Sequence, residues 1–125
     1  MTVSVAHKAL ADFNEGEAFF RHLSDTVVLG FPYGPSLGLL DRVVGVQAVR
    51  DRLGTAQSSG LRISDATIHD AGSHRCFAEC IGSYRAEDGR TVDVPLAAVI
   101  EHNSERITLI REHWDTLRLA TMNES

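Results

Sequence analysis

No apolar run in the sequence is long enough to cross a membrane, and the first residues lack the basic, apolar and small-residue order of a secretion signal. We therefore expect no contact with a membrane and a cytoplasmic location.

Basic residues are scarce as well. The 125 residues include 12 Lys and Arg against 17 Asp and Glu, which gives a formal net charge of −5, and no basic cluster is present. Proteins that bind nucleic acids neutralise phosphates with clustered Lys and Arg. We therefore expect no nucleic-acid partner.

Cysteine is limited to Cys76 and Cys80. If both lie on one strand, their α-carbons are about 13 Å apart, which is too far for a disulfide. Neither a CxxC nor an HxxxH pattern accompanies them, although the chain has six His residues. The sequence therefore predicts no metal site.

Apolar residues, in contrast, make up 43% of the chain, which is enough for the core of one domain. We assign residues 1–125 to a single domain, with residues 121–125 as a disordered polar tail. Apolar residues at helical spacing predict helices over residues 3–15, 17–23 and 45–57.

Strand patterns dominate the rest of the chain and fall in six segments: residues 26–31, 41–44, 61–70, 74–87, 90–102 and 107–115. Pro95 lies inside one of them, where it cannot donate a ladder hydrogen bond, and it predicts a bulge or bend. The order of elements predicts an α+β fold with helices on one face of an antiparallel sheet.

The last predicted strand carries an unusual carboxylate. Side chains alternate between the faces of a strand, so Ile110, Glu112 and Trp114 share one face. A charge between an isoleucine and the only tryptophan is costly to bury unless it is paired or neutral. Glu112 is therefore either an acid or base in a functional pocket, or the partner of a helix arginine such as Arg21 or Arg50.

Small residues share one face of an earlier predicted strand: Cys76, Ala78, Cys80 and Gly82. Either they leave volume for a ligand, or a helix packs closely against them. Nothing near Cys80 in the sequence would lower the pKa of its thiol, so we do not expect a nucleophile. Tyr33 follows a strand and is expected to stack on a planar ligand at the cavity mouth; Trp114 has either that role or one in core packing.

Six motifs, spread from end to end, carry a resemblance to a known family. They are Asn14-Glu15-Gly16, Phe31-Pro32-Tyr33-Gly34-Pro35, Gly45-Val46-Gln47-Ala48-Val49, Glu79-Cys80-Ile81-Gly82, Asp88-Gly89-Arg90 and Ile110-Arg111-Glu112-His113-Trp114-Asp115. Together they resemble the SnoaL-like polyketide cyclases of the nuclear-transport-factor-2-like (NTF2-like) superfamily. The resemblance implies a cone: a curved antiparallel sheet wrapped around three N-terminal helices, with a ligand cavity between them. It also implies a homodimer, which we place on the convex face of the sheet.

This fold does not fix an activity. Ketosteroid isomerases, which the chain resembles in fold, need a base, a tyrosine and a neutral acid. In this sequence the three positions fall on Phe31, Ala9 and Ala97, the last by counting across an equal-length hairpin. None of these side chains can do that chemistry, so the resemblance does not imply this reaction.

Two other activities ask for different residues. Limonene-type epoxide hydrolases use a carboxylate that maps onto Glu112, but their Arg and second Asp map onto Cys80 and Gly82. That reaction would need a substitute such as Arg85. Cyclase-like members need only one carboxylate with a raised pKa and apolar walls, and Glu112 matches this position.

Three hypotheses follow. The first is a cofactor-free cyclase or isomerase that moves a proton on a small apolar or polyketide-like molecule. The second is a binding module without catalysis, for a hydrophobic ligand or partner, and the third is an activity like that of epoxide hydrolases; whether the chain is an enzyme stays open. The expected catalytic residue is Glu112, and the expected ligand-binding residues are Phe31, Tyr33, Cys80, Ala97, Ile110 and Trp114.

Overall fold

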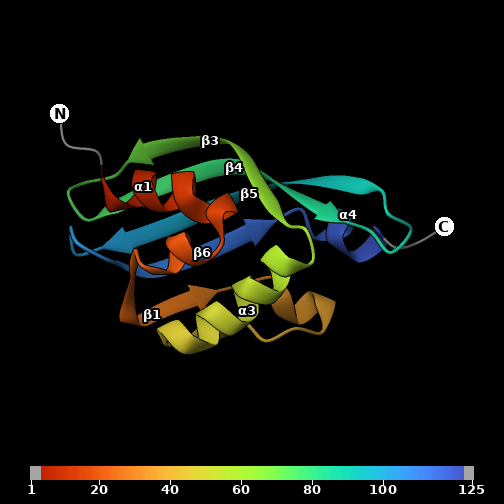
Figure 1. Cartoon of the computed structure of the whole chain (residues 1–125), viewed down its shortest axis with the longest axis horizontal. Coiled ribbons are helices and arrows are strands. Elements are labelled where there is room, and N and C mark those ends of the chain that lie inside the picture. Colours follow the sequence, from red (N-terminus) through yellow and green to blue (C-terminus); the bar gives the residue numbers. More distant parts are fainter. Residues whose placement is uncertain (1–3, 123–125) are drawn as a thin grey trace.

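The computed structural model describes residues 4–122. Helices and strands follow in the order α1 (Val5–Asp12), η1 (Phe13–Glu15), α2 (Glu17–Phe20), β1 (Leu23–Gly30), η2 (Gly34–Leu37), β2 (Arg42–Val44), α3 (Val46–Ser58), β3 (Arg62–Asp70), β4 (Arg75–Arg85), β5 (Thr91–His102), β6 (Ile107–Trp114) and α4 (Thr116–Thr121). The architecture is α+β, as the sequence predicts, with helices packed on one face of a curved sheet (Figure 1).

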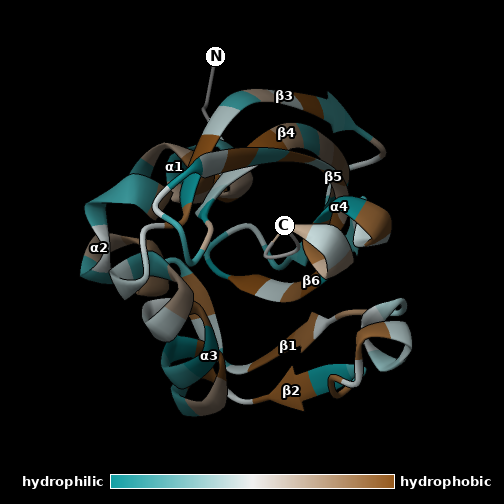
Figure 2. Cartoon of the chain, turned by 90° about the vertical axis from the view of Figure 1, so that its right-hand side faces the viewer, coloured by the Kyte–Doolittle hydropathy of each residue, from teal (hydrophilic) through white to brown (hydrophobic). Residues whose placement is uncertain are grey.

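Six strands form one sheet in the order β2-β1-β6-β5-β4-β3. Neighbouring strands are antiparallel except β1 and β6, which run parallel, so the expectation of a purely antiparallel sheet is wrong at this pair. Seen from the end that carries α4, the sheet curves from β3 through β5 and β6 to β2, while α1, α2 and α3 lie along its open side (Figure 2). The curvature gives the sheet a concave inner face that the helices cover.

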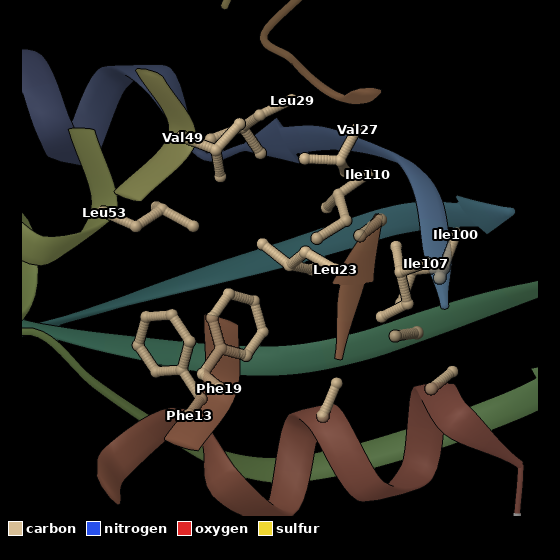
Figure 3. Packing of buried hydrophobic residues seen from close by; sticks show 14 of the residues in the cluster. Phe13, Phe19, Leu23, Val27, Leu29, Val49, Leu53, Ile100, Ile107 and Ile110 are labelled. Atoms are coloured by element: carbon tan, nitrogen blue, oxygen red, sulfur yellow. The ribbon is translucent and has the colours of Figure 1, made fainter. Parts of the chain in front are cut away.

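The core lies between the concave face and the helices. On β4, residues Cys76, Ala78, Cys80 and Gly82 are all buried, which confirms that the small residues face inward. Phe13 and Phe19 from the helical segment pack edge to face with ring centroids 5.0 Å apart. They lie on the same side of the core as α1, while Val49 and Leu53 of α3 approach from the other side (Figure 3).

Asn14 joins the helical segment to the sheet edge. Its side-chain amide donates to the Ile63 carbonyl and accepts from the Ile63 backbone N–H, both at 2.9 Å. The Arg62 guanidinium donates to the Asn14 carbonyl at 2.6 Å. The backbone N–H and carbonyl of Ile63, at the start of β3, are therefore both satisfied by a side chain of η1, which ties the helical segment to the edge of the sheet.

Of the bulge or bend predicted at Pro95, the bulge is not formed. Pairing of β4 with β5 is continuous through Ile81 and Pro95. The Pro95 carbonyl accepts from the Asp115 backbone N–H, so the side of Pro95 that lacks a donor faces the end of β6, where the ladder stops at Trp114. Little hydrogen bonding is lost there. The irregularity lies elsewhere in β5, between Glu101 and His102, where the pairing with β6 shifts by one residue.

A last helix, α4, follows β6 and was not predicted. The Asp115 side chain accepts from the Arg118 backbone N–H at 3.1 Å, which is an ordinary helix N-cap. The predicted tail of residues 121–125 begins inside this helix, at Thr121, and residues 123–125 lie outside the described part of the chain. Within residues 4–122, no helix combines the length and the apolar character needed to cross a membrane.

Candidate functional site

Two adjoining chambers lie between the concave face and the helices. The inner chamber has a volume of about 50 Å³, and apart from Cys80, Tyr84 and Glu112 its lining is aliphatic or phenyl. The outer chamber is wider, about 660 Å³, and opens toward α4 and the η2 loop, with Leu119 and Leu39 in its wall. Four residues line both chambers: Leu53, Leu61, Tyr84 and Glu112. Both polar groups of this boundary come from strands, so the sheet holds them.

Glu112 occupies the inward face of β6, as alternation from Ile110 predicts. Its half-buried carboxylate accepts a hydrogen bond from the Trp114 indole N–H at 3.2 Å. Burial raises the pKa of Glu112, and the Trp114 hydrogen bond and the charge of Arg52 oppose that rise. A carboxyl group in this setting exchanges its proton closer to neutral pH than an exposed glutamate does.

One of the two roles left open for Glu112, a structural ion pair with a helix arginine, is not formed among the described residues. Arg50, one of the two arginines expected as its partner, binds Glu17 instead, with 3.1 Å between Arg50 Nη2 and Glu17 Oε1. Among the described residues no arginine or lysine lies within ion-pair distance of Glu112, Arg21 included. Glu112 is therefore a carboxylate at a cavity wall whose charge is not neutralised by direct contact.

Tyr84 is the second polar group of this boundary, and it is not among the residues expected from the sequence to bind a ligand. It lies on the inward face of β4, two residues beyond Gly82, and is half-buried. Its hydroxyl makes no hydrogen bond to any described residue. Burial and the nearby charge of Glu112 raise the pKa of Tyr84, so the phenol stays protonated and can donate a hydrogen bond. Alternation from Cys76 through Gly82 predicts this inward position of Tyr84, but the pattern carries no signal for its role as a donor.

An aromatic pair with a cation forms one wall of the outer chamber. The rings of Phe31 and Trp114 lie with centroids 5.1 Å apart and an interplanar angle of 34°. The guanidinium of Arg52, from α3, lies 4.9 Å from the centroid of the Phe31 ring. Phe31 and Trp114 therefore line the outer chamber, which for Trp114 is one of the two roles that the sequence left open. This wall offers flat apolar surface next to a positive charge.

Cys80 and Ile110 face the inner chamber. Burial and the charge of Glu112 raise the pKa of the Cys80 thiol to about 11. The thiol is therefore neutral at physiological pH and contributes volume and apolar contact, not a nucleophile.

Two of the expected ligand-binding residues lie elsewhere. Tyr33 is 51% exposed and its ring packs on His113, on the outer side of the sheet, so it lines neither chamber. Ala97 also points outward, because it pairs with His113, whereas Ala98 pairs with Glu112 and lines the inner chamber. The prediction for Ala97 is wrong for a physical reason. The shift between Glu101 and His102 breaks the equal-length hairpin that the count assumed.

The described residues contain no group of three or more His, Cys, Asp or Glu side chains that could hold a metal ion. The side chains that line the two chambers supply a proton-exchanging carboxyl (Glu112), a phenol donor (Tyr84) and a cation (Arg52).

Comparison with solved structures places the fold. An NTF2-like protein from Anabaena variabilis ATCC 29413 superposes with a TM-score of 0.73 at 18% identity, over 88% of this chain and 86% of that one. The chain has the NTF2-like fold. No protein-family model matches the chain, and no curated protein matches it significantly in sequence.

Other proteins with the same fold are nearly the same length. TerC, crystallised with polyporic acid, superposes with a TM-score of 0.82 at 17% identity, over 97% of this chain and 96% of TerC. A candidate polyketide cyclase from Pseudomonas putida KT2440 gives 0.76 at 22% identity, over 96% of both chains. The predicted cone is thus confirmed as an NTF2-like fold, and at these identities the likeness concerns the fold alone.

Proposed function

We propose that this NTF2-like chain is a cofactor-free enzyme of the cyclase or isomerase type, in which Glu112 moves a proton on a small, largely apolar carbonyl compound. The observation that carries the proposal is the boundary between the two chambers. There an unpaired carboxyl with a raised pKa and a phenol without a hydrogen-bond partner line the same apolar space. That TerC was crystallised with polyporic acid supports a small organic molecule as the occupant of this fold.

The chemistry follows from these two groups. The Glu112 carboxylate removes a proton from a carbon next to a carbonyl, and the electron pair of that C–H bond moves to the carbonyl oxygen. The Tyr84 hydroxyl donates a hydrogen bond to the enolate oxygen. Glu112 then returns the proton to another carbon, which is isomerisation. In a cyclisation the enolate carbon instead attacks a second carbonyl of the same substrate, and Glu112 protonates the new alkoxide.

Ring closure and isomerisation both benefit from a wall that fixes the substrate. Phe31 and Trp114 supply that wall in the outer chamber, next to Glu112. A planar substrate stacked there presents one edge to the carboxyl group. Holding the substrate in this orientation lowers the barrier to proton transfer.

A direct test is hydrogen exchange in D₂O at the carbon acid of 2-tetralone, followed by NMR. The wild-type protein is expected to accelerate exchange over buffer, and Glu112→Gln to lower the acceleration by about 10²–10⁴-fold, the range for loss of a general base. Trp114 fluorescence reports whether the ketone binds. If the wild type and Glu112→Gln both bind the ketone but neither accelerates its hydrogen exchange, the proposed enzymatic function is contradicted.

That outcome would favour the second function, a binding module for hydrophobic molecules. One observation supports it: the three isomerase positions carry Phe31, Ala9 and Ala97, and Ala98, which takes the inward place of Ala97, is no acid either. The epoxide-hydrolase alternative has less support. The wall positions Cys80 and Gly82 carry no charge, and Arg85, the substitute considered, lines neither chamber.

A further inference from the structure

Arg52 is the cation of the outer chamber. Among the described residues that line this chamber, Arg52 is the only positively charged group and Glu112 the only carboxylate. Its guanidinium is held over the Phe31 ring at 4.9 Å from the centroid. Stacking of this kind fixes the plane of a guanidinium while leaving its N–H groups at the edge free to donate.

A second arginine on the same helix gives the contrast. Arg50, two residues earlier, lies over the Phe20 ring at 5.6 Å and forms an ion pair with Glu17 at 3.1 Å. Arg52 forms neither an ion pair nor a hydrogen bond with any residue from 4 to 122. Its donors are thus uncommitted within the described chain and lie in the wall of a chamber that also holds the candidate acid or base.

The sizes of the chambers limit how a ligand can lie. The inner chamber, at about 50 Å³, has room for only a few heavy atoms and has an apolar lining. The outer chamber, at about 660 Å³, falls in the range of small-molecule sites. The body of a ligand therefore lies in the outer chamber, between the aromatic wall and the open end, where Arg52 is the strongest hydrogen-bond donor.

We propose that Arg52 binds a carboxylate on the ligand, so that the substrate class is a small carboxylic acid with a flat apolar body. The inference rests on the proposed function for the site itself and adds the group by which the ligand is recognised. A planar guanidinium binds a carboxylate through two parallel N–H···O bonds, which fixes orientation as well as affinity. With the carboxylate at Arg52 and the body on Phe31 and Trp114, the rest of the ligand points to the boundary residues Tyr84 and Glu112.

A consequence follows for the proton transfer. The charge of Arg52 holds the pKa of Glu112 down against the effect of burial. A ligand carboxylate on Arg52 neutralises that charge, so the bound ligand makes Glu112 a stronger base than it is in the empty site. Arg52 thus both binds the carboxylate of the ligand and sets the pKa of Glu112, the group that acts on the ligand.

The test compares matched acids and amides: 2-naphthoate with 2-naphthamide, 4-phenylbenzoate with 4-phenylbenzamide, and hexanoate with hexanamide. Dissociation constants are measured by NMR titration of the wild-type protein, Arg52→Gln, Arg52→Lys and Arg50→Gln. We expect the wild type to bind at least one acid about tenfold more tightly than its amide, the factor for one charge-assisted contact. Arg52→Gln should abolish the preference and Arg52→Lys should retain part of it, while Arg50→Gln, the matched control on α3, keeps it whole.

The outcomes separate this inference from the proposed function. Equal binding of acids and amides by the wild type would overturn the role of Arg52 while the cavity remains a ligand site, and that result does not depend on any variant folding. A preference lost equally in Arg50→Gln would overturn it too, since the effect would then be one of overall charge. No binding of any of the six compounds at 5 mM would overturn both the inference and the proposed ligand site.

Discussion

At the scale of single residues, Glu112 combines two properties that structural carboxylates seldom share. No arginine or lysine of the described chain forms an ion pair with it, and among these residues it accepts a side-chain hydrogen bond only from a neutral donor, the Trp114 indole. A glutamine at the same place keeps an acceptor for that indole and removes only the charge. The pair Glu112 and Glu112→Gln therefore isolates the energetic effect of the charge.

We expect Glu112→Gln to be more stable than the wild type at neutral pH, by about 0.5–2 kcal/mol, because functional groups held in apolar sites reduce stability. The folded-state pKa of Glu112 is raised above its unfolded value, so the charged form destabilises the fold at pH values above the raised pKa. The advantage of the variant should shrink as pH falls from the raised pKa to the ordinary value of a glutamate and vanish below it. Urea denaturation at several pH values measures this difference.

The opposite pattern would refute this view of Glu112. A variant that is less stable at neutral pH, with a deficit that fades in acid, would mean that the ionised carboxylate has a stabilising partner in solution.

Tyr84 supplies the second prediction at this scale. Because its hydroxyl has no partner among the described residues, Tyr84→Phe should change the free energy of unfolding by less than about 0.5 kcal/mol. If the hydroxyl stabilises an enolate, the same variant should slow 2-tetralone exchange about 10²-fold, the typical loss for one such donor. Thermal unfolding and exchange rates are measured on the same sample. A large loss of stability with normal exchange would assign Tyr84 to the core instead.

At the scale of elements, two glycines with opposite surroundings test the framework around the outer chamber. A Cβ on Gly34, in η2, would lie 2.6 Å from the Leu40 carbonyl oxygen, which is backbone and cannot move aside easily. A Cβ on Gly54, inside α3, would meet nothing within 4 Å. The loop at Gly34 is therefore closely packed against its own backbone, while α3 at Gly54 has open space.

Gly34→Ala is expected to lower the free energy of unfolding by about 1–3 kcal/mol, as overpacking does. Gly54→Ala should raise it by about 0.5–1 kcal/mol, the difference between alanine and glycine inside a helix. Denaturant titrations of both variants give the two signs, and each variant serves as the control for the other. If both variants changed the free energy of unfolding in the same direction, the packing of the η2 loop would differ from that described.

Element by element, the sequence reveals what depends on local pattern. Alternation along β6 predicts that Ile110, Glu112 and Trp114 share a face. In agreement with this, Ile110 and Glu112 both line the inner chamber. What alternation cannot show is a one-residue shift between strands, because Ala97 and Ala98 are equally small and either could face inward. The shift near His102 therefore moved the expected site by one residue.

At the scale of the whole molecule, the least predictable feature is the parallel pairing of the first long strand with the last. Leu29 pairs with Ile110 although 80 residues of sequence lie between them, and no local pattern encodes such a contact. This pairing brings β1, and with it Phe31, beside the strand that carries Glu112 and Trp114. The aromatic wall of the candidate site is thus a product of topology, and only its separate residues could be predicted.

The outer face of the sheet carries the last prediction, the homodimer. Phe77 of β4 points away from the cavity and is 43% exposed, beside Val99 of β5. Large apolar side chains exposed on a sheet face favour association, and a stable interface needs about 800 Å² from each partner. We propose that two copies pair through this face, so Phe77→Asp should give a monomer with the fold retained.

Light scattering coupled to size exclusion measures the mass at 10–200 µM, and circular dichroism checks the fold. Leu117→Asp is the matched control, because Leu117 is 72% exposed on α4 and receives the same charge outside the sheet face. The control should remain dimeric. A wild-type monomer at 200 µM would contradict the homodimer, and dissociation of the Leu117→Asp variant would move the interface from the sheet to α4, the helix beside the mouth of the outer chamber.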